Sequence, residues 1–113
     1  MGDLTAERVA LNDALFRETN ERIRAQAELY ELTDAIPFIC ECADPRCTII
    51  LRLDVAEYEH VRSDSTWFLN APGHETSAGG NAEVAEHHGE YDIVRKVGRA
   101  ADIVEQLDRR TNA

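Results

Sequence analysis

Three cysteines lie within one short segment of this chain, Cys40-Glu41-Cys42-Ala43-Asp44-Pro45-Arg46-Cys47. Zinc binds thiolate sulfur at about 2.3 Å, and three thiolates with one histidine form a common closed tetrahedral site. The Pro-containing turn brings Cys42 and Cys47 close enough to share one ion. Cys40 joins them only if the chain bends, because residues two apart on an extended strand are spread too widely for one tetrahedron. The sequence therefore predicts one structural zinc ion (Zn2+) at the tip of a hairpin.

The fourth ligand could be a histidine elsewhere in the chain. We favour His74, because Pro72 and Gly73 hold it in a rigid turn after a predicted strand. His60 is also available, and His87 and His88 are held in reserve. A ligating imidazole usually donates its free N–H to an acceptor, and the nearby acidic residues that can accept it are Glu41, Asp44 and Glu75.

Other interpretations of the cysteines stay open. Cysteine is often buried as a small hydrophobic residue, but acidic residues and a polar turn separate these three. Thiolates also hold iron–sulfur clusters and act as redox switches. A zinc hydrolase would need an open metal position and a carboxylate base, for which Glu41 or Glu75 is the candidate. An odd number of cysteines argues against a disulfide framework.

The charge balance limits the partners that we expect. Acidic side chains number 22 against 12 basic ones, which gives a net charge of −10. This balance opposes direct nucleic-acid binding, which needs clustered Lys and Arg, and it favours attraction to a protein with a basic surface. No apolar run reaches the roughly 18 residues of a membrane span. Without a signal segment at the N-terminus, we expect a cytoplasmic protein that does not bind membranes.

Residues 5 to about 32 predict a long helix, because Thr5 is a good N-cap and the segment lacks Pro and Gly. We assign residues 1–33 to this amphipathic helix. Its apolar face includes a strict seven-residue series, and the opposite face carries Arg17, Glu21, Arg24, Glu28 and Glu31. The apolar face packs either on the protein's own sheet or on a partner or second copy. The partner-binding candidates are Val9, Phe16, Ile23 and Tyr30.

Residues 36–113 predict a small zinc-binding α+β domain. Asp54 and Glu57 form a capping box that opens a helix over residues 55–62. Periodicity and turn residues predict the other elements. They are strands at 38–42, 48–53, 67–69 and 91–97, a loop at 76–80, a helix at 81–88 ended by Gly89, and a final helix at 99–109. The expected architecture is thus a long N-terminal helix with one small antiparallel sheet, a zinc-knuckle hairpin and short helices.

The segment from Phe38 to Val61 carries Cys-x-Cys-x4-Cys, and residues 72–75 read Pro-Gly-His-Glu. Together with Lys96-x-Gly98 and the helix after it, these motifs resemble a group of small uncharacterised actinobacterial proteins over roughly residues 10–109. That group usually has Thr where Asp54 stands, and its tail tends to end in Thr-Asp-Pro-Arg where this chain has Leu107-Asp108-Arg109-Arg110. The resemblance implies the ligand set Cys40, Cys42, Cys47 and His74, and it implies no activity.

The sequence therefore predicts a non-enzymatic regulatory or adaptor protein that binds zinc and acts through protein–protein contacts, with the transcription machinery as one conceivable setting. The expected partner is a larger protein with a basic surface, or a second copy through the N-terminal helix. The alternatives are a thiol-redox or metal-responsive switch and a zinc-dependent hydrolase.

Overall fold

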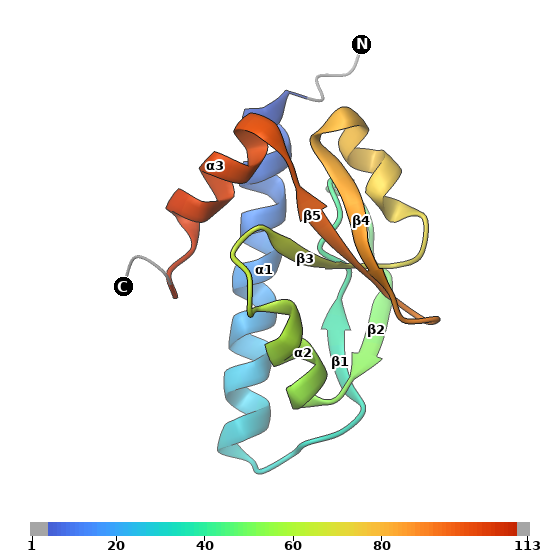
Figure 1. Cartoon of the computed structure of the whole chain (residues 1–113). Coiled ribbons are helices and arrows are strands. Elements are labelled where there is room, and N and C mark those ends of the chain that lie inside the picture. The colour runs from blue at the N-terminus through green and yellow to red at the C-terminus, as the bar shows by residue number, and fades with distance from the viewer. Residues whose placement is uncertain (1–4, 111–113) are drawn as a thin grey trace.

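The computed structural model describes residues 5–110 and has the predicted α+β architecture (Figure 1). Residues 1–4 of the predicted N-terminal segment lie outside the described part. The elements in chain order are α1 (Ala6–Leu29), β1 (Ile36–Ile39), β2 (Ile50–Leu53), α2 (Val55–Val61), β3 (Trp67–Asn70), the 3-10 helix η1 (His74–Asn81), β4 (Ala82–His87), β5 (Asp92–Lys96) and α3 (Gly98–Leu107).

Helix α1 begins where the sequence predicts and ends slightly earlier. The Thr5 hydroxyl accepts a hydrogen bond from the backbone N–H of Arg8 at 3.2 Å. The helix ends at Leu29 instead of continuing to residue 32, and Glu31 adopts a positive φ of 59°. A non-glycine residue in the left-handed region cannot continue a right-handed helix, so the chain turns here toward β1.

The buried side of α1 differs from the predicted one. Asp13, Arg17 and Asn20 are buried, whereas Leu11 and Leu15 are 55% and 59% exposed. The expectation that Arg17 lies on the solvent face is therefore wrong. The helix instead packs a mixed side against the rest of the fold, in which small apolar residues accompany these three polar ones, and it leaves leucines outside.

This orientation is possible because the three buried polar side chains of α1 have partners. The Asp13 carboxylate pairs with the Lys96 ammonium at 2.6 Å. The Arg17 guanidinium donates to two backbone carbonyls, those of Ser65 at 2.7 Å and Val104 at 2.9 Å. Burying polar groups costs little when such bonds replace those lost from water.

The four predicted partner-binding residues differ in solvent exposure. Val9 is only 2% exposed, Phe16 and Ile23 are partly buried, and Tyr30 is 69% exposed. A strict seven-residue spacing drifts by about 20° per heptad on a straight helix, so this series runs from the core to the surface. Val9 therefore belongs to the core and cannot form part of an exposed binding face.

The strands form two antiparallel sheets, whereas the sequence predicts one. Strands β1 and β2 pair from Ile36 opposite Leu53 to Ile39 opposite Ile50. The second sheet has the order β3-β5-β4. Between them lies the main core, which includes Phe38 stacked on Tyr58 with ring centroids 4.4 Å apart. This core also contains Cys40 and Cys42.

Residues 74–88 contradict the sequence-based assignment. The predicted loop at 76–80 is part of η1, and the predicted helix at 81–88 is strand β4. Asn81 donates its amide to the Ala78 carbonyl at 2.9 Å instead of capping a following helix. Segment 82–87 pairs along β5 with a bulge between Val84 and Glu86, and this pairing overrides the modest helix preference of Ala and Glu.

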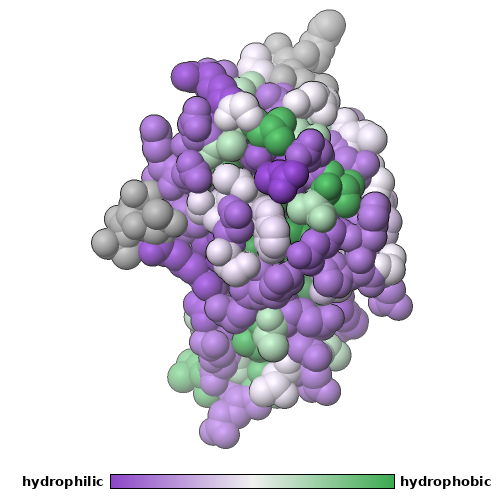
Figure 2. Space-filling view, viewed as in Figure 1, coloured by the Kyte–Doolittle hydropathy of each residue, from purple (hydrophilic) through white to green (hydrophobic). Residues whose placement is uncertain are grey.

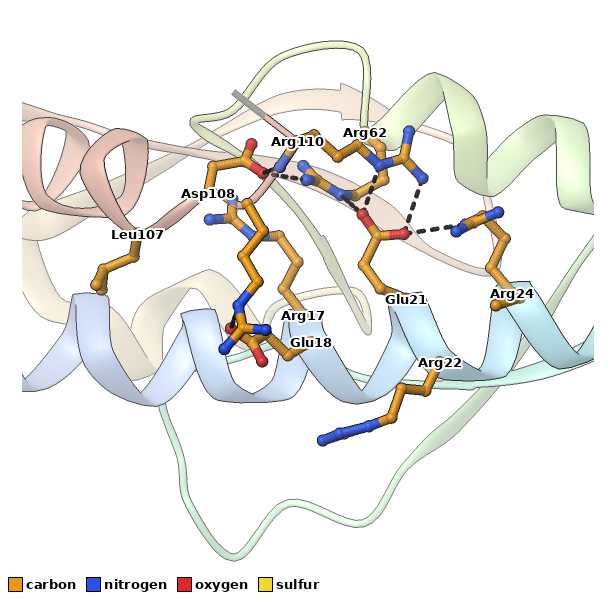
Figure 3. A pocket seen from close by; sticks show the side chains of 11 residues that line it. Arg17, Glu18, Glu21, Arg22, Arg24, Arg62, Leu107, Asp108 and Arg110 are labelled. Atoms are coloured by element: carbon orange, nitrogen blue, oxygen red, sulfur yellow. Dashed lines mark hydrogen bonds and ion pairs between the residues drawn. The ribbon is translucent and has the colours of Figure 1, made fainter. Parts of the chain in front are cut away.

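The capping box of α2 is confirmed, with the Asp54 N–H donating to Glu57 at 2.8 Å. A cluster of charged residues then ties α2 to α1 and to the segment after α3 (Figure 3). Glu21 lies at its centre and accepts from Arg62, Arg110 and Arg24 at 2.8, 2.5 and 3.0 Å. This cluster lines a cavity of about 360 Å³.

The molecular surface is consistent with the acidic, charged composition. The face shown in Figure 2 is mainly hydrophilic, and hydrophobic residues appear there only in small patches. Among residues 5–110, no helix combines the length and the apolar character that crossing a membrane requires.

Candidate metal centre

The four predicted ligands come together. One donor atom from each of Cys40, Cys42, Cys47 and His74 lies within 4.8 Å of the others. His74 Nδ1 is 3.7 Å from Cys40 Sγ and 3.7 Å from Cys47 Sγ. Around a tetrahedral zinc ion, the ligand distances imply sulfur–nitrogen separations of about 3.5 Å and sulfur–sulfur separations of about 3.8 Å. The two sulfur–nitrogen distances therefore fit a zinc ion to within a few tenths of an ångström, and the other donor separations lie within 4.8 Å.

The backbone after β1 supplies the bend that Cys40 requires. Strand β1 ends at Ile39, and the Cys40 N–H donates to the Ile49 carbonyl at 3.0 Å. The next residue, Glu41, donates its N–H to Leu69 of β3 at 2.6 Å. The chain thus changes partners between consecutive residues, and this change lets Cys40 and Cys42 reach one point.

A tight turn places the third sulfur. The Cys47 N–H donates to the Asp44 carbonyl at 3.1 Å, and the Arg46 N–H donates to the Asp44 carboxylate at 2.9 Å. Asp and Pro favour such turns. Asp44 therefore orients the knuckle, a role that differs from the predicted one of accepting the imidazole N–H.

His74 is positioned by the predicted Pro-Gly turn. Gly73 has a φ of 85°, which suits glycine, and the His74 N–H donates to the Ala71 carbonyl at 3.0 Å. His74 is the first residue of η1, so it is fixed at the start of a short helix. The centre therefore joins the β1–β2 connection to a segment some thirty residues later in the chain.

The local electrostatics suit thiolate ligands. The Ala71 N–H donates to Cys40 Sγ at 3.1 Å, and such a bond favours a charged sulfur. A hydrogen bond from Cys40 lowers the pKa of Cys42 to about 4, with further help from His74. The shared hydrogen bond and burial raise the pKa of Cys40, and burial raises that of Cys47. A bound cation would favour the charged form of all three sulfurs and would displace the thiol protons.

Glu41 serves the core instead of the metal. Its carboxylate accepts from the Tyr58 hydroxyl at 2.6 Å, the Asn20 amide at 2.8 Å and the Leu69 N–H at 2.8 Å. Alternation along the chain separates Glu41 from the neighbouring cysteines, and this signal was present in the sequence. The arrangement gives no support to Glu41 as an acceptor for His74 or as a catalytic base.

Glu75 differs from the other two acidic candidates. Its Oε1 is buried and has no hydrogen-bond partner among the described residues. Glu75 directly follows His74 in the chain, so it remains the candidate acceptor for the imidazole N–H.

The other histidines are engaged elsewhere. His87 Nδ1 lies 2.9 Å from the Asp92 carboxylate. His60 and His88 both face Glu86. The reserve ligands therefore do not join the cysteines, and the prediction of His74 is confirmed as the histidine beside them.

This donor set would leave zinc no open position. Three thiolates and one imidazole complete a tetrahedron, whereas zinc that activates water has only three protein ligands. Such a closed set is typical of a structural ion.

No family model, curated protein or solved structure matches this chain. The resemblance to the small actinobacterial proteins therefore stays a prediction, and the function has to be argued from the site.

Proposed function

We propose that this chain is a non-enzymatic zinc-binding protein of the regulatory or adaptor kind, in which one closed ion stabilises the fold. The observation that carries the proposal is the convergence of Cys40, Cys42, Cys47 and His74 on a volume the size of one zinc coordination sphere. The protein would act through its surface, because a tetrahedron filled by protein ligands has no position for a substrate.

The location of the site supports a structural role for the metal. Cys40 and Cys42 are buried within the main core, and Cys47 is partly buried beside it. The ligands come from two segments that are far apart in the chain and are already joined by hydrogen bonds such as that from the Ala43 N–H to the Ser77 hydroxyl at 2.9 Å, so an ion would add a further link in a chain too small to bury much hydrophobic area. Zinc binding free energy would then contribute directly to folding free energy.

The surface suggests where a partner would bind. Leu11, Leu15 and Leu29 are exposed on α1. A groove of about 450 Å³ is lined mainly by apolar residues that include Tyr30 and Leu32. Together with the net charge of −10, these features favour a larger protein that offers apolar side chains within a basic surface. A second copy of the chain is the alternative occupant.

The metal role is tested by zinc removal. We expect a strong chelator to lower the melting temperature of the wild-type chain by well over 10 °C, because a structural zinc ion contributes several kcal/mol. The variant Cys42→Ser should already melt at the lower temperature and should not respond further. The control His87→Ala should behave like wild type. An unchanged melting temperature after complete zinc removal would overturn the structural role.

The partner role is tested on the exposed leucines. The double variant Leu11→Ser with Leu15→Ser should keep the melting temperature and zinc content of wild type but lose partner capture or self-association, measured by sedimentation and by cross-linking in lysate. If this variant still captured a partner like wild type, the exposed leucines of α1 would not be the partner-binding surface.

A thiol switch is a second candidate, and the position of Cys47 favours it. Cys47 is partly exposed, whereas Cys40 and Cys42 are buried, so one thiolate is accessible to an oxidant. Two thiolates would give two electrons to hydrogen peroxide and form a disulfide, the peroxide would leave as two hydroxide ions that take protons from solvent, and the zinc would be released. Peroxide-dependent zinc release at micromolar oxidant would support this role, and millimolar resistance would exclude it.

A further inference from the structure

A second group of metal-ligand side chains lies outside the cysteine centre. His60 is in the last turn of α2, Glu86 is in β4, and His88 follows β4. One donor atom from each lies within 4.8 Å of the others. None of these three residues is a ligand of the cysteine centre, and none has a part in the proposed function.

Both imidazoles aim the same nitrogen at one carboxylate. His60 Nε2 is 3.1 Å from Glu86 Oε1 and 3.3 Å from Oε2, and His88 Nε2 is 2.7 Å from Oε1. Two ligands bound to one ion at about 2.1 Å are separated by about 2.9 to 3.4 Å for angles between octahedral and tetrahedral values. The distances from His60 to the carboxylate therefore lie within the range for two ligands of one metal ion, and the distance from His88 lies slightly below it.

Aromatic neighbours hold both imidazole rings in place. The His88 ring stacks on Tyr91 with centroids 4.8 Å apart and an interplanar angle of 7°. The His60 ring meets Trp67 edge to face at 5.4 Å. Tyr91 is itself oriented by its hydroxyl, which donates to Glu57 at 3.3 Å. Rotamers that are fixed before binding lower the entropic cost of capturing an ion.

The strand geometry brings Glu86 and His88 to the same side. Residues two apart on a strand share a face, and the bulge between Val84 and Glu86 shifts the register just before this pair. Bulges commonly redirect side chains in this way. The face so presented meets the C-terminal end of α2, from which His60 reaches across.

We propose that His60, Glu86 and His88 form an exchangeable site for a divalent first-row transition-metal ion such as Zn2+ or Ni2+. Two neutral imidazoles and one carboxylate suit these ions, and the net negative charge of the chain attracts cations. The three side chains are partly exposed, at 49%, 34% and 35% of their surface. The remaining coordination positions face solvent and are free for water or for a ligand from a partner. This inference does not depend on the proposed function, because the two sites share no ligand.

The chain contains an internal reporter for this site. Trp67 is its single tryptophan, and its ring lies against His60. Paramagnetic Ni2+ bound beside it should quench its fluorescence. The experiment titrates Ni2+ at neutral pH into a tag-free chain dialysed to one zinc ion per chain, so that only the cysteine centre is occupied, and the zinc content is measured before and after to show that this centre is unchanged.

We expect saturable quenching with one Ni2+ per chain. His88→Ala and Glu86→Gln should each weaken Ni2+ binding about tenfold or more, since even residues outside the coordination shell cost that much. His87→Ala is the matched control, because this neighbouring histidine pairs with Asp92 instead, and it should bind Ni2+ like wild type. Both test positions lie at the surface, and two variants guard against a folding defect in one.

Three results would overturn the proposal. They are an absence of saturable quenching up to millimolar Ni2+, equal affinity in wild type and both variants, and an equal loss of affinity in His87→Ala. The first would leave Glu86 as a hydrogen-bond acceptor for the two histidines and nothing more.

Discussion

Asn20 offers the sharpest test of how α1 is oriented. Its amide donates to the Ile39 carbonyl and to the Glu41 carboxylate, both at 2.8 Å, and its oxygen accepts from the Ile39 N–H at 2.9 Å. Asn20→Ala removes three hydrogen bonds, each worth about 1 kcal/mol net, and leaves buried partners unpaired. We expect the variant to lose about 3 to 5 kcal/mol of unfolding free energy.

The matched control is Leu15→Ala on the exposed side of the same helix. Leu15 is 59% exposed, so its truncation should cost only about 0.5 kcal/mol. Urea unfolding of both zinc-loaded variants, followed by circular dichroism, measures the two losses. A larger loss for Leu15→Ala than for Asn20→Ala would refute the orientation of α1 and would restore the apolar face as the buried one.

Three further predictions concern individual contacts. Bonds from three arginines outweigh the effect of burial and lower the pKa of Glu21 from 4.5 to about 2. The stabilisation that Glu21 contributes is therefore present above about pH 4.5 and is lost as the pH falls toward 2. Glu21→Gln should cost about 1 to 2 kcal/mol of unfolding free energy at pH 7 after allowance for solvent screening, and paired urea titrations should show this difference from wild type shrinking to nothing near pH 2. His74→Ala should weaken zinc binding at least 100-fold in chelator competition, more than loss of an outer-shell residue does, while His87→Ala should not change it. Tyr58→Phe removes the hydroxyl that bonds Glu41 at 2.6 Å, so thermal melting should show a loss of about 2 kcal/mol, and a neutral result would mean that this bond adds nothing.

The residues of the candidate metal centre were largely predictable because the turns that present them are local, although the meeting of the two segments is not. The spacing of Cys42 and Cys47 around Pro45 and the Pro-Gly turn before His74 depend on short-range geometry. The capping box at Asp54 is local in the same sense. Such features do not depend on long-range contacts, so they can be predicted directly from the sequence.

The buried side of α1 was not predictable from hydrophobic periodicity. That method assumes that leucines face inward and polar residues outward. Here Asp13 and Asn20 find partners on β5, β1 and the following segment, and those partners are distant in sequence. Leu11 and Leu15 are left outside as a result.

The strand β4 was missed for a related reason. Its residues include Glu83 and Glu86, which favour helix when considered alone. Pairing with β5 decides the conformation, and the register of that pairing cannot be seen within a window of six residues. The division into two sheets likewise depends on long-range pairing.

The most direct test of the metal centre is the zinc and thiol content of the chain purified without added metal. Elemental mass spectrometry counts the ion, and a thiol reagent counts reactive cysteines before and after denaturation with a chelator. We predict one tightly held zinc per chain and three thiols that react fully only after denaturation. A folded chain without zinc, a chain that holds iron with visible absorbance, or a Cys42→Ser variant that retains its zinc would contradict the assignment of Cys40, Cys42, Cys47 and His74 as a structural zinc site.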